Sequence, residues 1–407
     1  MPRSRLLLLL AVSAGCGGGA SDPAATPSPT ATASPSEAVA PARTPDDGEQ
    51  IAALLARRAR ALGGGDAQAL ARTAIGAQRA GDRTAARRAE PLPLAGVTLS
   101  ATGATARGTG VVDVRADLGY RVRGVPGRFI TRRRLVVVRT PAGWRVRRDR
   151  PVRDAPPWEA GAFTAWSARR ALVLAPRGFD AVAVTTAAAS AYAKVRQRLP
   201  GRRVPQRVLV VVAGDLGQAR TLLGTARGPE GLSALADSVV TESGPALRVR
   251  RVLSQRLLVL ADRWAELDAE GRERVLAHEL VHVALAPTTS GRVPAWLLEG
   301  VALHLSGDDR RAEARARAAG GRRGRLARLS RPGAIGGLSG EAQTAAYVTA
   351  SAAAETIVAR VGVRGLLTLY DAFGDESIPG PPGPRLTDRV LRRTLGGSLA
   401  QLERAIE

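Results

Sequence analysis

The sequence predicts an α+β protein with two folded domains, and three observations support this class. Residues 48–152 begin with helical patterns and continue as a series of strand-like runs. Residues 169–407 begin with short apolar strands that form a small sheet and end in a helical lower half. Ahead of both lies a segment with few large apolar residues, which cannot bury enough surface to fold. The remaining length suffices for two domains.

The first residues are typical of an export signal. Arg3 and Arg5 precede a short apolar run at 6–12, which is too short to cross a bilayer, and small residues lead into Cys16. This order resembles a bacterial lipoprotein signal, although Ser13 departs from the more usual leucine. The resemblance implies removal of residues 1–15, a lipid on Cys16, and an extracytoplasmic protein anchored to the membrane. The alternative is an ordinary secreted protein.

The segment at 16–47 consists mostly of Ala, Pro, Ser, Thr and Gly and is expected to be a disordered tether. The chain has 60 basic and 36 acidic residues, for a net charge of +24. Such a surface favours anionic lipid headgroups or cell-wall polymers as partners. Nucleic acid is not expected, because the basic residues are not interleaved with aromatic ones. One cysteine excludes an internal disulfide.

The first domain, 48–152, is predicted to contain two helices followed by antiparallel strands. The helices are expected at 49–62 and 66–77, and the strands at 97–105, 108–117, 120–125, 129–140 and 143–149. This order resembles the cone-shaped fold of nuclear transport factor-like domains. That fold hosts many functions, so the resemblance implies none. We find no catalytic constellation in this domain. A connector containing proline and tryptophan follows at 153–168.

The second domain, 169–407, is predicted to alternate strands and helices before its helical end. Strands are expected at 171–174, 208–212, 248–251 and 256–260, and helices at 179–198, 216–223, 341–361, 363–373, 387–394 and 399–406. The last two strands would be joined by 252–255. Because they precede the helix described next, we expect an extended peptide to pair with 257–260.

An H-E-x-x-H motif is the main functional signal. His278 and His282 are two of only three histidines, and Glu279 follows the first. A helix is expected from the N-cap Asp268 to the stop at Pro287. On that helix the two imidazoles share one face and can bind one zinc ion, while the apolar face packs on the core. The histidine face would line a cleft. The alternative is a buried helix with two structural histidines.

A third ligand is expected from the next helix, which begins near Pro294. Glu299 is a lone carboxylate in an apolar setting there, and a metal partner would remove the cost of burying it. His304 is the rival ligand. It lies about 140° around the same helix from Glu299, so both cannot easily face one ion. Glu299 is therefore favoured, and His304 is expected to be structural and partly exposed.

With its H-E-x-x-H run followed by P-x-W-x-x-E-G-x-A at 294–302, the chain resembles the glutamate-zincin metallopeptidases, and most closely the peptidase MA-like group. The resemblance implies a zincin-like domain and a zinc peptidase acting on protein or peptide substrates. Its ligands would be His278, His282 and Glu299, with Glu279 as general base and Tyr347 as oxyanion donor.

The chain departs from the family pattern at Leu303, where some glutamate zincins carry an aspartate. The residue that orients a ligand imidazole is therefore not identified. Tyr347 could equally be a core aromatic residue. A catalytically silent, zincin-like binding or scaffold protein is the main alternative function, and a zinc hydrolase acting on another amide or ester is a further one.

Overall fold

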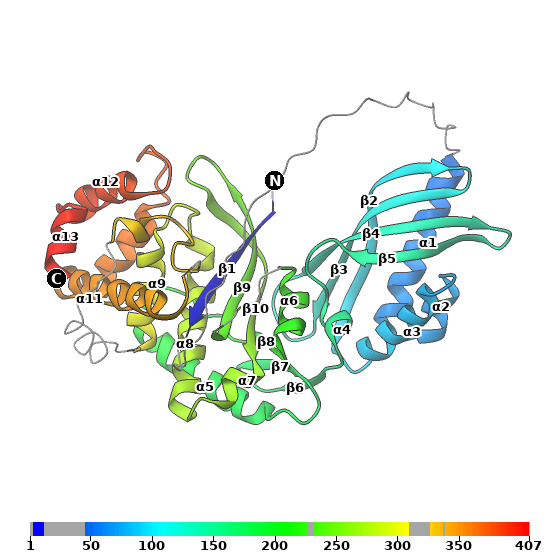
Figure 1. Ribbon diagram of the computed structural model, residues 1–407, viewed down its shortest axis with the longest axis horizontal. Coiled ribbons are helices and arrows are strands. Elements are labelled where there is room, and N and C mark those ends of the chain that lie inside the picture. Colours follow the sequence, from blue (N-terminus) through cyan, green and yellow to red (C-terminus); the bar gives the residue numbers. More distant parts are fainter. Residues whose placement is uncertain are drawn as a thin grey trace, which may run out of the picture.

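The computed structural model describes residues 3–11, 45–225, 229, 231–308, 326–336 and 338–406 (Figure 1). A four-stranded and a six-stranded sheet, each with packed helices, confirm the α+β class. Within the described ranges, no helix has both the length and the apolar character needed to cross a membrane. Cys16 and most of the predicted tether lie outside the described residues.

The first unit is an antiparallel sheet in the order β2-β3-β4-β5, covered by three helices. Its elements are α1 (Pro45–Gly63), α2 (Ala67–Arg72), α3 (Gln78–Ala89), β2 (Leu94–Gly108), β3 (Val111–Val122), β4 (Phe129–Thr140) and β5 (Gly143–Pro151). The two strands predicted at 108–117 and 120–125 are one strand, because Gly119 stays in register opposite Ile130. The helix α3 was not predicted, because its arginine-rich sequence shows little apolar periodicity.

The predicted connector is ordered rather than a simple linker. It contains the short helix α4 (Pro157–Ala160) and the strand β6 (Thr164–Ser167), which pairs with the next strand and so belongs to the second sheet. The amide of Ala155 donates to the carbonyl of Thr221 at 3.0 Å. This segment therefore ties the two units together.

The second sheet has the order β1-β9-β10-β8-β7-β6. Its strands are β1 (Arg3–Ala11), β7 (Ala171–Ala175), β8 (Val208–Ala213), β9 (Leu232–Ser243) and β10 (Arg248–Leu260). The helices between these strands are α5 (Ala181–Arg198) and α6 (Leu216–Leu223), and α7 (Ala261–Ala265) follows β10. Part of the predicted signal segment is thus β1, which runs antiparallel along β9 (Figure 1).

Two predictions about this sheet are wrong. The strands expected at 248–251 and 256–260 are one strand, β10, with register shifts near the expected break. Because β10 is paired with β8 on one side and β9 on the other, residues 257–260 lie inside the sheet and cannot take up a peptide. The strand β9, which was not predicted, separates them from the edge.

The other described elements of the second unit are helices (Figure 1). They are α8 (Ala269–Leu285), α9 (Ala295–Ser306), α11 (Gly340–Ala372), α12 (Pro384–Leu395) and α13 (Leu399–Ile406), with short 3-10 turns at Ala286–Thr288 and Arg328–Ser330. Gly362, with φ of 70°, breaks α11 where two helices were predicted. A Cβ at Gly300 would lie 2.4 Å from the Ala350 carbonyl oxygen, so glycine allows the close packing of α9 on α11.

Candidate metal centre

The helix α8 carries the H-E-x-x-H motif. Asp268 is its N-cap as predicted, and its carboxylate accepts a hydrogen bond from the Gly271 amide at 2.7 Å. Residues 275–286 are all buried, since the sheet covers one side of the helix and α5 and α9 the other. The expectation that the histidine face lines an open cleft is therefore wrong. Neighbouring elements cover that face as well.

The helix α9 supplies the carboxylate. Pro294 occupies its N-cap with extended backbone, and the helix ends at Gly307, which has a left-handed backbone. Almost all of its side chains are apolar and buried, and Glu299 is only 4% exposed among them. An ionised carboxylate in such surroundings is unfavourable without a partner of opposite charge.

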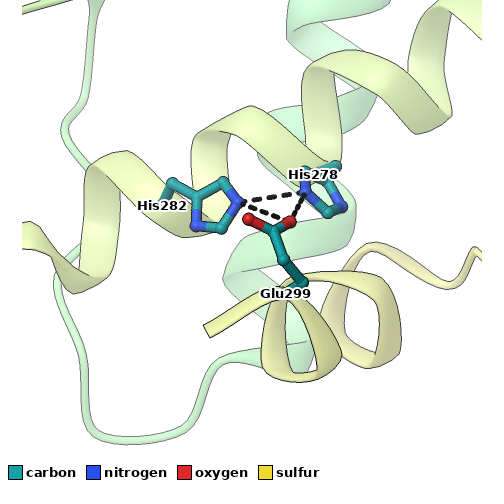
Figure 2. A group of neighbouring side chains, drawn as sticks. All are labelled: His278, His282 and Glu299. Atoms are coloured by element: carbon teal, nitrogen blue, oxygen red, sulfur yellow. Dashed lines mark hydrogen bonds and ion pairs between the residues drawn. The ribbon is translucent and has the colours of Figure 1, made fainter. Parts of the chain in front are cut away.

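Three ligand atoms converge between α8 and α9 (Figure 2). The Nε2 atoms of His278 and His282 are 3.0 Å apart. Glu299 Oε2 lies 3.1 Å from Nε2 of His278 and 3.5 Å from Nε2 of His282. Ligands bound about 2.0–2.1 Å from a tetrahedral zinc ion stand about 3.3–3.4 Å apart. The observed separations bracket that value, and this group could hold a metal ion.

Burial and the neighbouring charges shift the pKa values of two of these side chains. Burial lowers the pKa of the His278 imidazole, although Glu299 opposes the shift. Burial alone would raise the pKa of Glu299, but the charge of His282 and hydrogen bonds from both imidazoles outweigh it and lower this pKa to about 2. A neutral imidazole beside a carboxylate is the form that coordinates a cation.

Glu279 has a different environment from Glu299. It is fully buried, and neither carboxylate oxygen has a hydrogen-bond partner among the described residues. Burial, and then the charge of Glu299, raise its pKa well above the ordinary value, and the backbone of Ala236 in β9 opposes this only in part. A cation held by the neighbouring ligands would favour the charged form of Glu279.

Of the other predicted site residues, His304 and Tyr347 lie in the described part of the chain. His304 is partly buried on α9 and is not in the ligand group, as expected. Tyr347 is fully buried in α11, three residues before Ala350, which packs on Gly300 next to Glu299. Tyr347 therefore lies on the face of α11 that meets α9. Cys16 is not among the described residues.

The two ligand imidazoles differ from most metal-bound histidines in their outer surroundings. The Nδ1 atoms of His278 and His282 are buried and have no hydrogen-bond partner in the described part of the chain. Ala236 was not predicted as a site residue, because β9 itself was not predicted.

Comparison with protein-family models, curated proteins and solved structures finds no match for this chain.

Proposed function

We propose that this protein is a zinc-dependent peptidase. The observation that carries the proposal is the convergence of two imidazole nitrogens and one carboxylate oxygen, 3.0–3.5 Å apart, in a buried setting. Three such protein ligands leave a fourth tetrahedral position open, as catalytic zinc sites require. Imidazole together with carboxylate suits zinc among the divalent ions. The proposed location, outside the cytoplasm and anchored through Cys16, rests on the sequence alone.

Each site residue would have a distinct task. When bound, zinc lowers the pKa of a water molecule toward ~7 and polarises a carbonyl group. Glu279, next to the first ligand, would accept the proton of the attacking water and pass it to the leaving amine. Apart from the backbone of Ala236, no donor among the described residues approaches its oxygens, which leaves them available for this transfer. Tyr347 is the proposed hydroxyl donor to the oxyanion.

A peptide substrate would bind along β9. The backbone of Ala236 lies close enough to influence Glu279, so this strand borders the site. Its outer side pairs with β1 in the described structure, over Arg3↔Thr241 to Ala11↔Leu232. The same backbone groups would pair with an extended peptide if β1 were removed with the signal segment. The proposed substrate edge is thus one strand away from the edge first expected.

Cleavage of a broad peptide library by the protein without residues 1–15, which leaves the outer side of β9 unpaired, tests the proposal with zinc present. We expect Glu279→Gln to reduce cleavage by about 10²–10⁴-fold, because proton transfer is lost, while zinc stays bound. Glu270→Gln is the matched control, since Glu270 lies on the same helix but pairs with Arg274 at the surface. Equal cleavage by the Glu279→Gln variant and the unmodified protein would contradict the role of Glu279.

The main alternative is a catalytically silent binding protein with the same metal site. The burial of His278, Glu279, His282 and Glu299, each at most 4% exposed, favours this reading. Zinc bound by the unmodified protein without cleavage of any library peptide would support it. The retained Glu279 favours the peptidase, since a site that only binds metal has no use for a neighbouring base.

A further inference from the structure

The first unit contains a cavity that the metal centre does not explain. It has a volume of about 520 Å³ and lies between the helices and the sheet, with α4 of the connector at its rim. Sites for small molecules typically have ~300–1,000 Å³. Its apolar lining includes Leu62, Leu70, Leu99, Leu118 and Trp158. The space therefore suits a compact molecule with an apolar body.

One wall of the cavity is a buried charge network. Arg58 donates to both oxygens of Asp82 at 2.6 and 2.9 Å and to Asp149 at 3.2 Å. Arg133 pairs with Asp149 at 2.7 Å and with Glu159 at 2.6 Å. All five side chains line the cavity. Their acidic groups are thus already engaged by arginine, and an incoming cation would have to compete for them.

The unused polar groups of the wall are donors. Arg58 Nε and Trp158 Nε1 are buried without an acceptor among the described residues. Arg88 also lines the cavity, and within the described part of the chain it has no ion pair. The wall therefore offers hydrogen-bond donors and one unpaired guanidinium to an incoming group.

We propose that this cavity binds a small organic molecule with an apolar body and a carboxylate or similar anionic group. Arg88 meets the anionic group, and the apolar side chains hold the body. The bound molecule lies against α4, whose carbonyl at Ala160 accepts a hydrogen bond from Gln218 of α6 at 3.3 Å. The site is therefore at the junction of the two units. It does not depend on the metal proposal.

Two fluorescent probes of matched shape test this inference on the full-length protein. The anionic probe is 8-anilinonaphthalene-1-sulfonate, and the neutral one is N-phenyl-1-naphthylamine, which lacks the sulfonate. We expect saturable binding of both, with the anionic probe bound more tightly. Arg88→Gln is expected to weaken binding of the anionic probe by about fivefold, because one charge contact is lost. Binding of the neutral probe should weaken by less than about twofold. Arg87→Gln, at an exposed neighbouring position, is the control and leaves both unchanged.

A second variant tests the location without touching a charge. Ala85→Leu places a larger side chain in the cavity wall and is expected to weaken binding of both probes. The circular dichroism spectrum should stay unchanged. The inference is overturned if neither probe binds, if the neutral probe binds as tightly as the anionic one, or if Arg88→Gln and Arg87→Gln behave alike. Binding that Ala85→Leu leaves unaltered also overturns it, since the probe would then lie elsewhere.

Discussion

Two buried polar clusters, one in each unit, satisfy their charges in opposite ways. In the first unit every carboxylate of the network contacts an arginine, so the cluster is closed by groups of opposite sign. Between α8 and α9, in contrast, Glu299 contacts no arginine among the described residues and faces two imidazoles, whose Nε2 atoms are 3.0 Å apart. Glu279 lies beside them with no hydrogen-bond partner in the described chain. The first cluster is complete within the protein, and the second could hold a cation.

The role of a buried polar group depends on its partners. Burial alone does not mark a functional site, because Arg58 and Asp82 are as buried as Glu299. What separates the clusters is the balance of donors and acceptors. The comparison predicts that damage to the first cluster affects folding, whereas damage to the second affects metal binding.

The largest expected effect is on the first cluster. Asp82→Ala leaves Arg58 with a buried, partly unpaired charge, which should lower the free energy of unfolding by about 3–5 kcal/mol. Denaturant unfolding measures this. Asp113→Ala, which removes an exposed pair with Arg107, is the control and should change stability by less than about 1 kcal/mol. If both variants lost the same stability, the network would not be the closed unit described.

In the second cluster, Glu299→Ala should weaken zinc binding by more than ~100-fold, because loss of a ligand exceeds the ~10–100-fold effect of losing an outer partner. Isothermal titration with zinc measures the change. His304→Ala, on the same helix but outside the ligand group, should stay within about threefold of the unmodified protein. If His304→Ala weakened zinc binding more than Glu299→Ala did, His304 would be the third ligand.

The packing that positions Glu299 can be tested at Gly300. Gly300→Ala places a Cβ 2.4 Å from the Ala350 carbonyl oxygen, so α9 must move. We expect a loss of about 1–3 kcal/mol in unfolding free energy, together with weaker zinc binding. Gly48→Ala, where a Cβ meets nothing within 4 Å, is the control. It should be neutral or slightly stabilising, because alanine favours the helix.

The smallest expected effect is at the start of the motif helix. Asp268→Ala removes the N-cap hydrogen bond to Gly271 and should lower stability by about 1 kcal/mol without changing zinc stoichiometry. Thermal unfolding detects the shift. Asp268→Asn keeps a hydrogen-bond acceptor and should therefore keep most of the stability that Asp268→Ala loses. A large loss of zinc in Asp268→Ala would mean that the helix end, rather than its packing, positions the imidazoles.

Local patterns predicted the ligand cluster well, because its signals lie within single helices. The i, i+4 spacing of His278 and His282 and the apolar run around Glu299 are readable residue by residue. The strand β9 was missed because it is buried along most of its length and rich in Ala and Ser, so it shows no alternation of apolar and polar residues. The charge network joins residues up to 91 positions apart, and no local pattern encodes such pairing.

The zinc content of the full-length protein after equilibrium dialysis is the most direct test of the second cluster. We expect one zinc ion per chain in the unmodified protein and in Glu279→Gln, which keeps all three ligands. His282→Ala, which loses one imidazole, should retain much less. Absence of zinc from the unmodified protein, or equal content in His282→Ala, would contradict a metal centre here and leave His278 and His282 as structural histidines.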